Sequence, residues 1–153
     1  MDTADGDTII VFDEYGKIST DIKKTKGLFK IRLADIDAPE LKQTFGVQSK
    51  MHLQKLIELK RVKVVFYKID VYGRIIGTIH LVDKHNNITT YPSINAIMIE
   101  DGYAWFYSEY SDESSYAKFE EKARSLNKGL WSNKNNIPPW EFRKINKHNK
   151  KLK

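Results

Sequence analysis

The stretch LFKIRLADIDAPE, residues 28 to 40, decides the fold class of this chain, because a strand pattern runs directly into an acidic, proline-bent turn. Its apolar side chains recur at every second position, which is the period of a strand with one buried face, and Arg32 lies on the opposite, polar face. The turn that follows carries three acids: Asp35, Asp37 and Glu40. The sequence therefore predicts a strand that delivers unlike charges to one end of a sheet.

More short strands are predicted on both sides of this stretch. They are rich in β-branched and aromatic residues, are separated by turn-forming segments, and cover residues 8–12, 61–67, 74–82 and 88–91. Crossover helices are missing between most of them, so a small barrel or a sandwich is favoured over a parallel sheet.

Three helical segments complete the pattern. Residues 46–59 place Val47, Met51, Leu53 and Ile57 on one arc, residues 94–100 end before Gly102, and a third helix opens at Ser114 and Ser115 and closes at Gly129. The order of strands, helix, strands and helices predicts an α+β barrel with appended helices. An oligonucleotide-binding (OB) type barrel, with a helix between its third and fourth strands, is the preferred form.

Length and composition bound the class of protein. At 153 residues with 41% apolar residues, the chain is long enough for one domain with a core. It contains no run of eighteen uncharged apolar residues, so the sequence predicts no membrane span. The absence of cysteine excludes disulfides, zinc-thiolate sites and cysteine nucleophiles. No signal peptide is predicted, because Met1 is followed directly by DTADGDT.

The net charge of +6 is concentrated at one end of the chain. Residues 143–153 hold six basic residues and no acid, whereas residues 1–142 carry 20 basic and 20 acidic residues. We therefore divide the chain into a neutral domain, residues 1–142, and a basic C-terminal tail, residues 143–153. Two interpretations of the tail stay open, a solvated frayed terminus and a tether for phosphates.

Acidic residues gather at the ends of predicted strands, with Asp5 and Asp7 before one strand and Asp35, Asp37 and Glu40 after another. If these ends meet, the carboxylates would raise one another's pKa unless a cation lies among them. Without cysteine, and with isolated histidines, the ligands would all be oxygen, which suits Ca²⁺, Mg²⁺ or Mn²⁺. The alternative is that these acids are turn formers bonded to their own backbone.

Two arginines are predicted to reach the same place. Arg32 lies on the strand that leads into the acidic turn, and Arg74 follows the turn DVYG at the start of another strand. Two guanidinium groups beside a hard cation would form a phosphate clamp. Alternatively, each arginine neutralises a neighbouring aspartate.

Six motifs in the same order resemble the staphylococcal nuclease (thermonuclease) family. They are DGDT at 5–8, RLADIDAPE at 32–40, DVYGR at 70–74, DGYAWFY at 101–107, GLWS at 129–132 and PPWEFR at 138–143. The resemblance implies a five-stranded OB-type barrel with three helices. It also implies a Ca²⁺-dependent phosphodiesterase that cuts DNA and RNA with little sequence preference, leaving 3′-phosphate and 5′-hydroxyl ends.

The resemblance also assigns roles to single residues. Asp7, Asp37 and the backbone carbonyl of Ala38 would hold the Ca²⁺, with Asp5 behind them, and Glu40 would hold and activate the attacking water. Arg32 and Arg74 would grip the scissile phosphate. Tyr72 would donate to a terminal phosphate, and Tyr107 would stack on a base. The residues themselves allow a second interpretation, in which Tyr72 is a turn residue with a solvated hydroxyl and Tyr107 packs in the core, where we also expect Trp105 and Phe106.

The family places a long first strand ahead of DGDT, but only Met1 to Ala4 precede it here, so the first strand is expected to be truncated. Two rival functions stay open, a non-catalytic OB-fold module that binds nucleic acid and a protein-interaction barrel. The full set of acids and arginines favours the nuclease. The resemblance further implies a monomer that is secreted or placed in the cell envelope.

Overall fold

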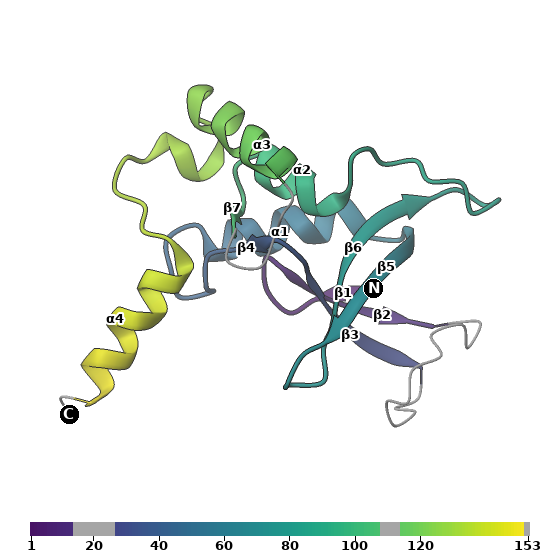
Figure 1. Cartoon of the computed structure of the whole chain (residues 1–153), viewed down its shortest axis with the longest axis horizontal. Helices are drawn as coiled ribbons and strands as arrows, with labels where there is room; N and C mark the ends of the chain where they lie inside the picture. The colour runs from purple at the N-terminus through teal and green to yellow at the C-terminus, as the bar shows by residue number, and fades with distance from the viewer. Residues whose placement is uncertain (14–26, 108–113, 152–153) are drawn as a thin grey trace.

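In the computed structural model, which describes residues 1–13, 27–107 and 114–151, five strands form one twisted sheet in the order β1-β2-β3-β6-β5 (Figure 1). The strands are β1 (Asp2–Thr3), β2 (Thr8–Phe12), β3 (Leu28–Leu33), β5 (Arg61–Ile69) and β6 (Ile75–Val82). Two further short strands, β4 (Ile36–Asp37) and β7 (Trp105–Phe106), pair antiparallel in a second sheet.

The pairing around β3 brings three distant turns together. β2 runs antiparallel to β3 with Thr8 opposite Arg32, so the DGDT turn lies beside the end of β3. β6 runs parallel to β3 and begins with Ile75 opposite Ile31 and Ile76 opposite Arg32, so the turn that enters β6 lies close to Arg32. Arg32 is therefore the point at which the turns before β2, after β3 and before β6 converge.

The predicted α+β class and five-stranded sheet are confirmed, with two differences. Within the described residues the edge strands β1 and β5 do not pair with each other, so the sheet stays open instead of closing into a barrel. The first strand is short, as expected, because β1 has only two residues and pairs with β2 alone. The strand predicted at 88–91 is wrong, since only Ile88 forms a single bridge, to Val82.

The described residues contain four α-helices where three helices were predicted. The helix predicted between the third and fourth strands is present as α1 (Gly46–Ile57), between β4 and β5. The other helices follow β6: α2 (Ile94–Glu100), α3 (Ser114–Ser125), the short 3₁₀ helix η2 (Gly129–Ser132) and α4 (Pro139–Lys151). Figure 1 shows α2 and α3 side by side, whereas α4 extends away from them to the C-terminus. Residues 143–151 therefore continue helix α4. None of the described helices is both long enough and apolar enough to cross a membrane.

Helix α1 buries only part of the predicted arc, since Leu53 and Ile57 face inward as predicted. Val47 and Met51 are exposed, and the buried stripe consists of Gly46, Ser49, Leu53 and Ile57. The reason lies at the first turn, where a Cβ on Gly46 would come within 1.9 Å of the Glu40 carbonyl oxygen. Glycine at this position lets the helix pack tightly beneath the acidic turn.

Two apolar clusters hold the molecule together. The larger one joins β2, β3, β6, α1 and α2 and includes fully buried Ile31, Leu53 and Ile99. The smaller one is built on Trp105, whose ring packs edge-on against Trp131 at 4.4 Å and Trp140 at 5.8 Å between ring centroids. The core position predicted for Trp105 and Phe106 is confirmed, because both rings pack in these clusters. Trp140 anchors α4 to the body, and this contact sets the position of the residues that follow it.

Candidate active site

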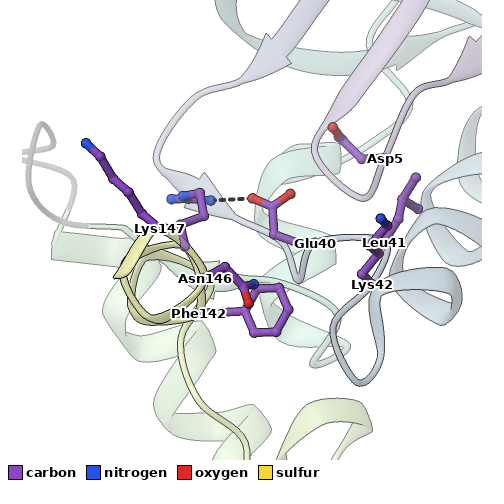
Figure 2. Close-up of a pocket in the computed structure, with 8 residues that line it drawn as sticks. Asp5, Glu40, Leu41, Lys42, Phe142, Asn146 and Lys147 are labelled. Carbon is purple, nitrogen blue, oxygen red and sulfur yellow. Dashed lines mark hydrogen bonds and ion pairs between the residues drawn. The ribbon is translucent and has the colours of Figure 1, made fainter. Parts of the chain in front are cut away.

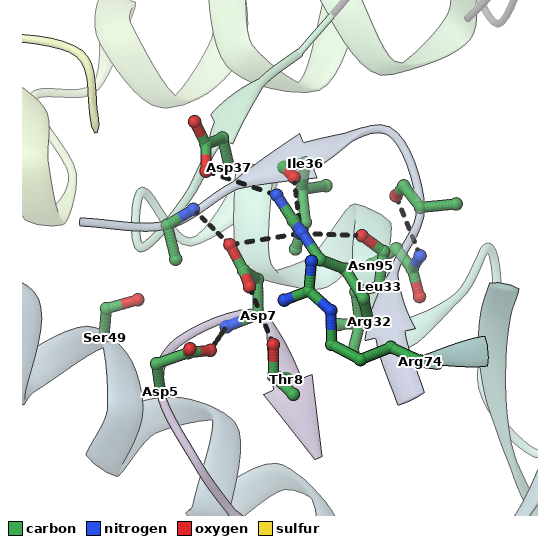
Figure 3. Close-up of polar contacts among 12 residues, drawn as sticks. Asp5, Asp7, Thr8, Arg32, Leu33, Ile36, Asp37, Ser49, Arg74 and Asn95 are labelled. Atoms are coloured by element: carbon green, nitrogen blue, oxygen red, sulfur yellow. Dashed lines mark hydrogen bonds and ion pairs between the residues drawn. The ribbon is translucent and has the colours of Figure 1, made fainter. Parts of the chain in front are cut away.

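The convergent turns enclose a cavity of about 350 Å³ at the end of β3 (Figure 3). Nine residues line it: Asp5, Asp7, Arg32, Asp37, Ala38, Glu40, Tyr72, Arg74 and Arg143. Eight of these are residues that the sequence assigned to a site. The ninth, Arg143, was assigned to the basic tail, and the predicted Tyr107 is not among the lining residues.

The DGDT turn delivers Asp7 to the cavity floor. The Asp5 carboxylate accepts a hydrogen bond from the Asp7 N–H at 3.0 Å, which closes a tight turn. A Cβ at Gly6 would lie 2.1 Å from the Ser49 Oγ, so only glycine lets this turn rest on α1. The turn-forming role proposed as an alternative for Asp5 is thus present, in a residue that also lines the cavity.

Asp7 is a buried carboxylate with few hydrogen-bond donors. Its Oδ2 accepts from the Ala38 N–H at 2.9 Å and forms an ion pair with Arg32 at 3.2 Å, while its Oδ1 accepts from the Thr8 hydroxyl at 3.2 Å. Burial raises the pKa of Asp7 to about 7, because the loss of hydration and the nearby charges of Asp5 and Asp37 outweigh the attraction of Arg32. The cavity floor therefore holds a proton-sensitive charge.

Arg32 joins the two buried aspartates. Its Nη1 contacts Asp7, its Nη2 donates to Asp37 Oδ1 at 3.2 Å, and Nη1 also donates to the carbonyl oxygens of Leu33 and Ile36 at 3.1 Å. The chain reversal that makes this possible uses Asp35 in the left-handed region, at φ 63°. Figure 3 shows the guanidinium at the centre of this network.

Arg74 is held by its own turn. The Asp70 carboxylate accepts from Arg74 Nε at 2.7 Å and from the backbone N–H groups of Tyr72 and Arg74 at 2.9 Å. Partial burial raises the pKa of Asp70, but these hydrogen bonds outweigh burial and leave it below the ordinary value. Figure 3 shows the Arg74 guanidinium directed toward Asp7 and Arg32, and it also lies 5.5 Å from the centroid of the exposed Tyr72 ring. Both interpretations of the arginines therefore hold, because each arginine pairs with an aspartate and both line the same cavity.

Arg143 closes the cavity from α4. Its Nη1 and Nη2 bind the two oxygens of Asp37 at 3.1 and 2.6 Å, and Nη1 also donates to Glu40 at 2.8 Å. These hydrogen bonds, with that to Asp37 first, raise the pKa of Arg143 above its ordinary value. Asp37 is 1% exposed and carries two guanidinium partners, whereas Glu40 is 42% exposed. Among the cavity carboxylates that form ion pairs, Glu40 is thus the most exposed to solvent.

The position of Arg143 could be suspected only from a local pattern. It lies three residues after Trp140, on the same face of a helix, so an anchored tryptophan would carry the arginine toward the body. Tyr107 is placed differently, because its ring contacts Trp140 at 5.3 Å between centroids. The proposed stacking role of Tyr107 remains a prediction.

The acidic residues of the cavity carry the type of donor atom that a hard cation prefers. Four carboxylates and three guanidinium groups line it, which leaves a formal charge of −1, or −2 without Arg143. Asp5, Asp7 and Asp37 offer only oxygen donors, as Ca²⁺ and Mg²⁺ require. Within the described residues no three acidic or histidine side chains are arranged to hold a metal, since Arg32 and Arg143 take oxygens of the aspartates. A cation would therefore have to compete with Arg143 for Asp37.

The chain matches a family model described as "Staphylococcal nuclease homologue" over residues 30–133. This range contains Arg32, Asp37, Glu40 and Arg74, whereas Asp7 and Arg143 lie outside it.

Three relatives illustrate the similarity. The chain is 35% identical to a micrococcal nuclease of Shigella flexneri over 94% of this chain and 78% of that protein. It is 34% identical to an uncharacterized endonuclease of Escherichia coli over 91% of this chain and 79% of that protein. It is 38% identical to a probable staphylococcal-like nuclease of Oryza sativa subsp. japonica over 76% of this chain, but it spans only 29% of that relative.

Proposed function

This chain belongs to the staphylococcal nuclease family, and on that premise we propose that it is a Ca²⁺-dependent phosphodiesterase that hydrolyses DNA and RNA with little sequence preference. The observation that carries the proposal is the convergence of Arg32, Arg74 and Glu40 with buried Asp7 and Asp37 around one cavity. Paired guanidinium groups beside carboxylates are the arrangement that phosphoryl transfer needs.

Asp7 and Asp37 would hold the cation together with the carbonyl oxygen of Ala38, and Asp5 would support them from behind. Bound there, Ca²⁺ would neutralise negative charge on the phosphate oxygens. The cavity's formal charge of −1 supports a need for it, because a phosphate would otherwise be repelled. Burial raises the pKa of Asp7, so its charged form lacks stabilisation that a cation bound there would supply.

The arginines and Glu40 would carry the chemistry. Arg32 and Arg74 each offer a planar fork of donors to the phosphate oxygens, and both are held by carboxylates that limit their motion. Glu40 would hold a water molecule in line with the leaving 5′ oxygen and accept a proton from that water. The new bond joins the water oxygen to phosphorus, the bond from phosphorus to the 5′ oxygen breaks, and that oxygen takes up a proton. The products would carry 3′-phosphate and 5′-hydroxyl ends.

Glu40 must leave Arg143 to act in this way. The Glu40 side chain is 42% exposed in that ion pair, so water and substrate can reach it. Tyr72, 81% exposed on the β5–β6 turn, would contact a terminal phosphate next to Arg74. Tyr107 would lie beyond the cavity and stack on a base farther along the strand.

The test is cleavage of single-stranded DNA and of RNA by the wild type, Glu40→Gln and Arg74→Ala, with Ca²⁺ and with excess chelator. We expect cleavage only with Ca²⁺ and a loss of roughly 100-fold or more in each variant. Analysis of the product ends tests the side on which the bond breaks. Thermal unfolding with increasing Ca²⁺ tests the cation separately, because a ligand that binds the folded state raises the melting temperature.

Matched controls keep the result specific. Glu121→Gln changes an exposed glutamate on α3, and Arg61→Ala changes an arginine at the opposite end of the β5–β6 hairpin from Arg74. Both should cleave like the wild type. If the wild type binds DNA but cuts neither DNA nor RNA with any divalent cation, a non-catalytic nucleic-acid-binding module replaces the nuclease. Cleavage that survives chelation would refute the calcium requirement alone.

A further inference from the structure

A groove of about 530 Å³ adjoins the catalytic cavity and lies between residues 40–42 and one face of α4 (Figure 2). Cavity and groove share three lining residues, Asp5, Glu40 and Arg143, so the groove is continuous with the cavity. Its volume falls in the range of small-ligand sites.

The two walls of the groove carry the same pair of chemical groups. Residues 40–42 contribute Leu41, which is 45% exposed, and Lys42. Helix α4 contributes Phe142 and Lys147, with Asn146 between them on the helix surface. Phe142 belongs to neither apolar cluster. Each wall therefore presents an apolar surface and an ammonium group.

The lysines of the groove are available to a ligand. Neither Lys42 nor Lys147 forms an ion pair within the part of the chain that the structure describes, and both are exposed. Three cationic and two acidic residues line the groove, for a formal charge of +1, against −1 in the cavity. An anionic ligand is thus favoured in the groove.

Gln43 ties the two walls together. Its side-chain oxygen accepts from the Glu40 N–H at 3.2 Å, and its side-chain nitrogen donates to the Ile137 carbonyl oxygen at 2.7 Å, just before α4. The Glu40 carbonyl accepts from the Gln43 N–H at 2.7 Å and packs on Gly46. The Trp140 contact with Trp105 holds the other end of this connection. The groove is therefore a built feature and not a chance gap beside a helix.

We propose that this groove is a nucleotide subsite for single-stranded substrate, next to the nucleotide whose phosphate is cleaved. The base would lie between Phe142 and Leu41, and the phosphates on its two sides would contact Lys42 at one wall and Lys147 at the other (Figure 2). Stacking on an aromatic ring suits any base, and lysines bind phosphate without reading sequence. The proposal rests on the proposed function, because it extends the same substrate path.

The first experiment measures binding without cleavage. A fluorescent strand of six thymidines with phosphorothioate linkages, which resist hydrolysis, is titrated with the full chain in Ca²⁺, and anisotropy reports binding. Phe142→Ala should weaken binding roughly tenfold, as expected for one lost stacking contact, and Phe142→Trp should retain it. Lys147→Ala should weaken binding and reduce the salt dependence by about one phosphate contact.

Ile145→Ala and Lys144→Ala are the matched controls, since both residues are exposed on α4 outside the groove. They test whether any truncation or any lost charge on this helix has the same effect. If the wild type does not bind the strand, or if Phe142→Ala and Lys147→Ala bind no more weakly than their controls, the groove is not a nucleotide subsite.

The second experiment separates the subsite from the catalytic proposal. With a cleavable strand of six nucleotides, Phe142→Ala and Lys147→Ala should raise KM with little change in kcat, and with a dinucleotide they should match the wild type. An equal loss on the dinucleotide would overturn the subsite. If the wild type cleaves neither substrate, the proposed function fails, while the binding titration still decides the groove.

Discussion

The candidate catalytic cavity and the groove share three residues, yet their charges are held in different ways. In the cavity, Asp7 and Asp37 are buried and bound by guanidinium groups, whereas in the groove Lys42 and Lys147 face solvent without an ion pair in the described residues. Removal of one buried partner leaves a charge that water cannot reach, and removal of an exposed charge does not. Stability should therefore depend on the cavity, and substrate length dependence on the groove.

The largest expected effect comes from Arg32→Ala. This change leaves Asp7 without its guanidinium partner and removes one of the two guanidinium partners of Asp37, so the free energy of unfolding should fall by about 3–5 kcal/mol. Cleavage should fall by roughly 1,000-fold or more. Urea unfolding and single-turnover rates measure the two losses. Lys147→Ala, by contrast, should unfold like the wild type, and similar destabilisation by both variants would end the contrast between the two regions.

Asp7 predicts the pH dependence of the cavity. Its pKa is about 7 in the folded chain against an ordinary value of 3.8, so the folded state binds the additional proton between these values. The free energy of unfolding should therefore decrease as pH rises from about 4 to about 7 and level off above that, relative to Asp7→Asn. Denaturant unfolding of both proteins across this range measures the difference. A difference that stays constant with pH would show that Asp7 does not titrate in this range.

Arg143→Gln addresses the residue that both regions share. It removes the guanidinium that holds Asp37 and Glu40, so Ca²⁺ should meet less competition, and its affinity should rise roughly tenfold, the equivalent of one charged hydrogen bond. Calorimetric titration with Ca²⁺ measures this affinity in the absence of substrate. Lys144→Gln, one residue along α4, is the control for the loss of charge. Weaker Ca²⁺ binding in Arg143→Gln would show that the arginine supports the cation site instead of competing for it.

Gln43→Ala should have the smallest effect. It removes the two hydrogen bonds that connect residues 40–42 to Ile137, without touching a cavity carboxylate. The walls of the groove should move more freely, so KM for a six-nucleotide strand should rise a few-fold with kcat almost unchanged. Thr44→Ala, an exposed neighbour, serves as the control. A fall in kcat on a dinucleotide would place the effect in the cavity instead of the groove.

Much of the sheet was predictable because its signals are local. The strand at 28–33 follows from alternating apolar residues, and α2 follows from its apolar pattern, with Ser93 as N-cap and Gly102 at φ 76° after its end. The predictions failed where packing chose among similar residues. In α1 the close approach of Gly46 to Glu40 leaves Val47 and Met51 exposed, and at 88–91 β-prone residues found no strand partner beyond one bridge.

Most residues that line the candidate catalytic cavity were predictable for a related reason. Its charged residues lie at strand ends, and the pairing of β2, β3 and β6 brings those ends together, so local motifs carried the prediction of Arg32, Asp37 and Arg74. The division at residue 142 shows the limit of that approach, because it falls inside α4. A charge count treated Arg143 as part of a basic tail, although the arginine belongs to the cavity lining.

The sequence by itself determined the α+β class, most strands of the larger sheet, family membership and eight of the nine residues at the cavity, because side-chain alternation and short motifs act over a few neighbouring positions. The tertiary structure decided the open sheet, the inward face of α1 and the position of α4. Arg143 meets Asp37 across 106 positions of the chain, and this contact exists only because Trp140 docks on Trp105. Contacts at that separation depend on how the whole core packs, so no local pattern specifies them.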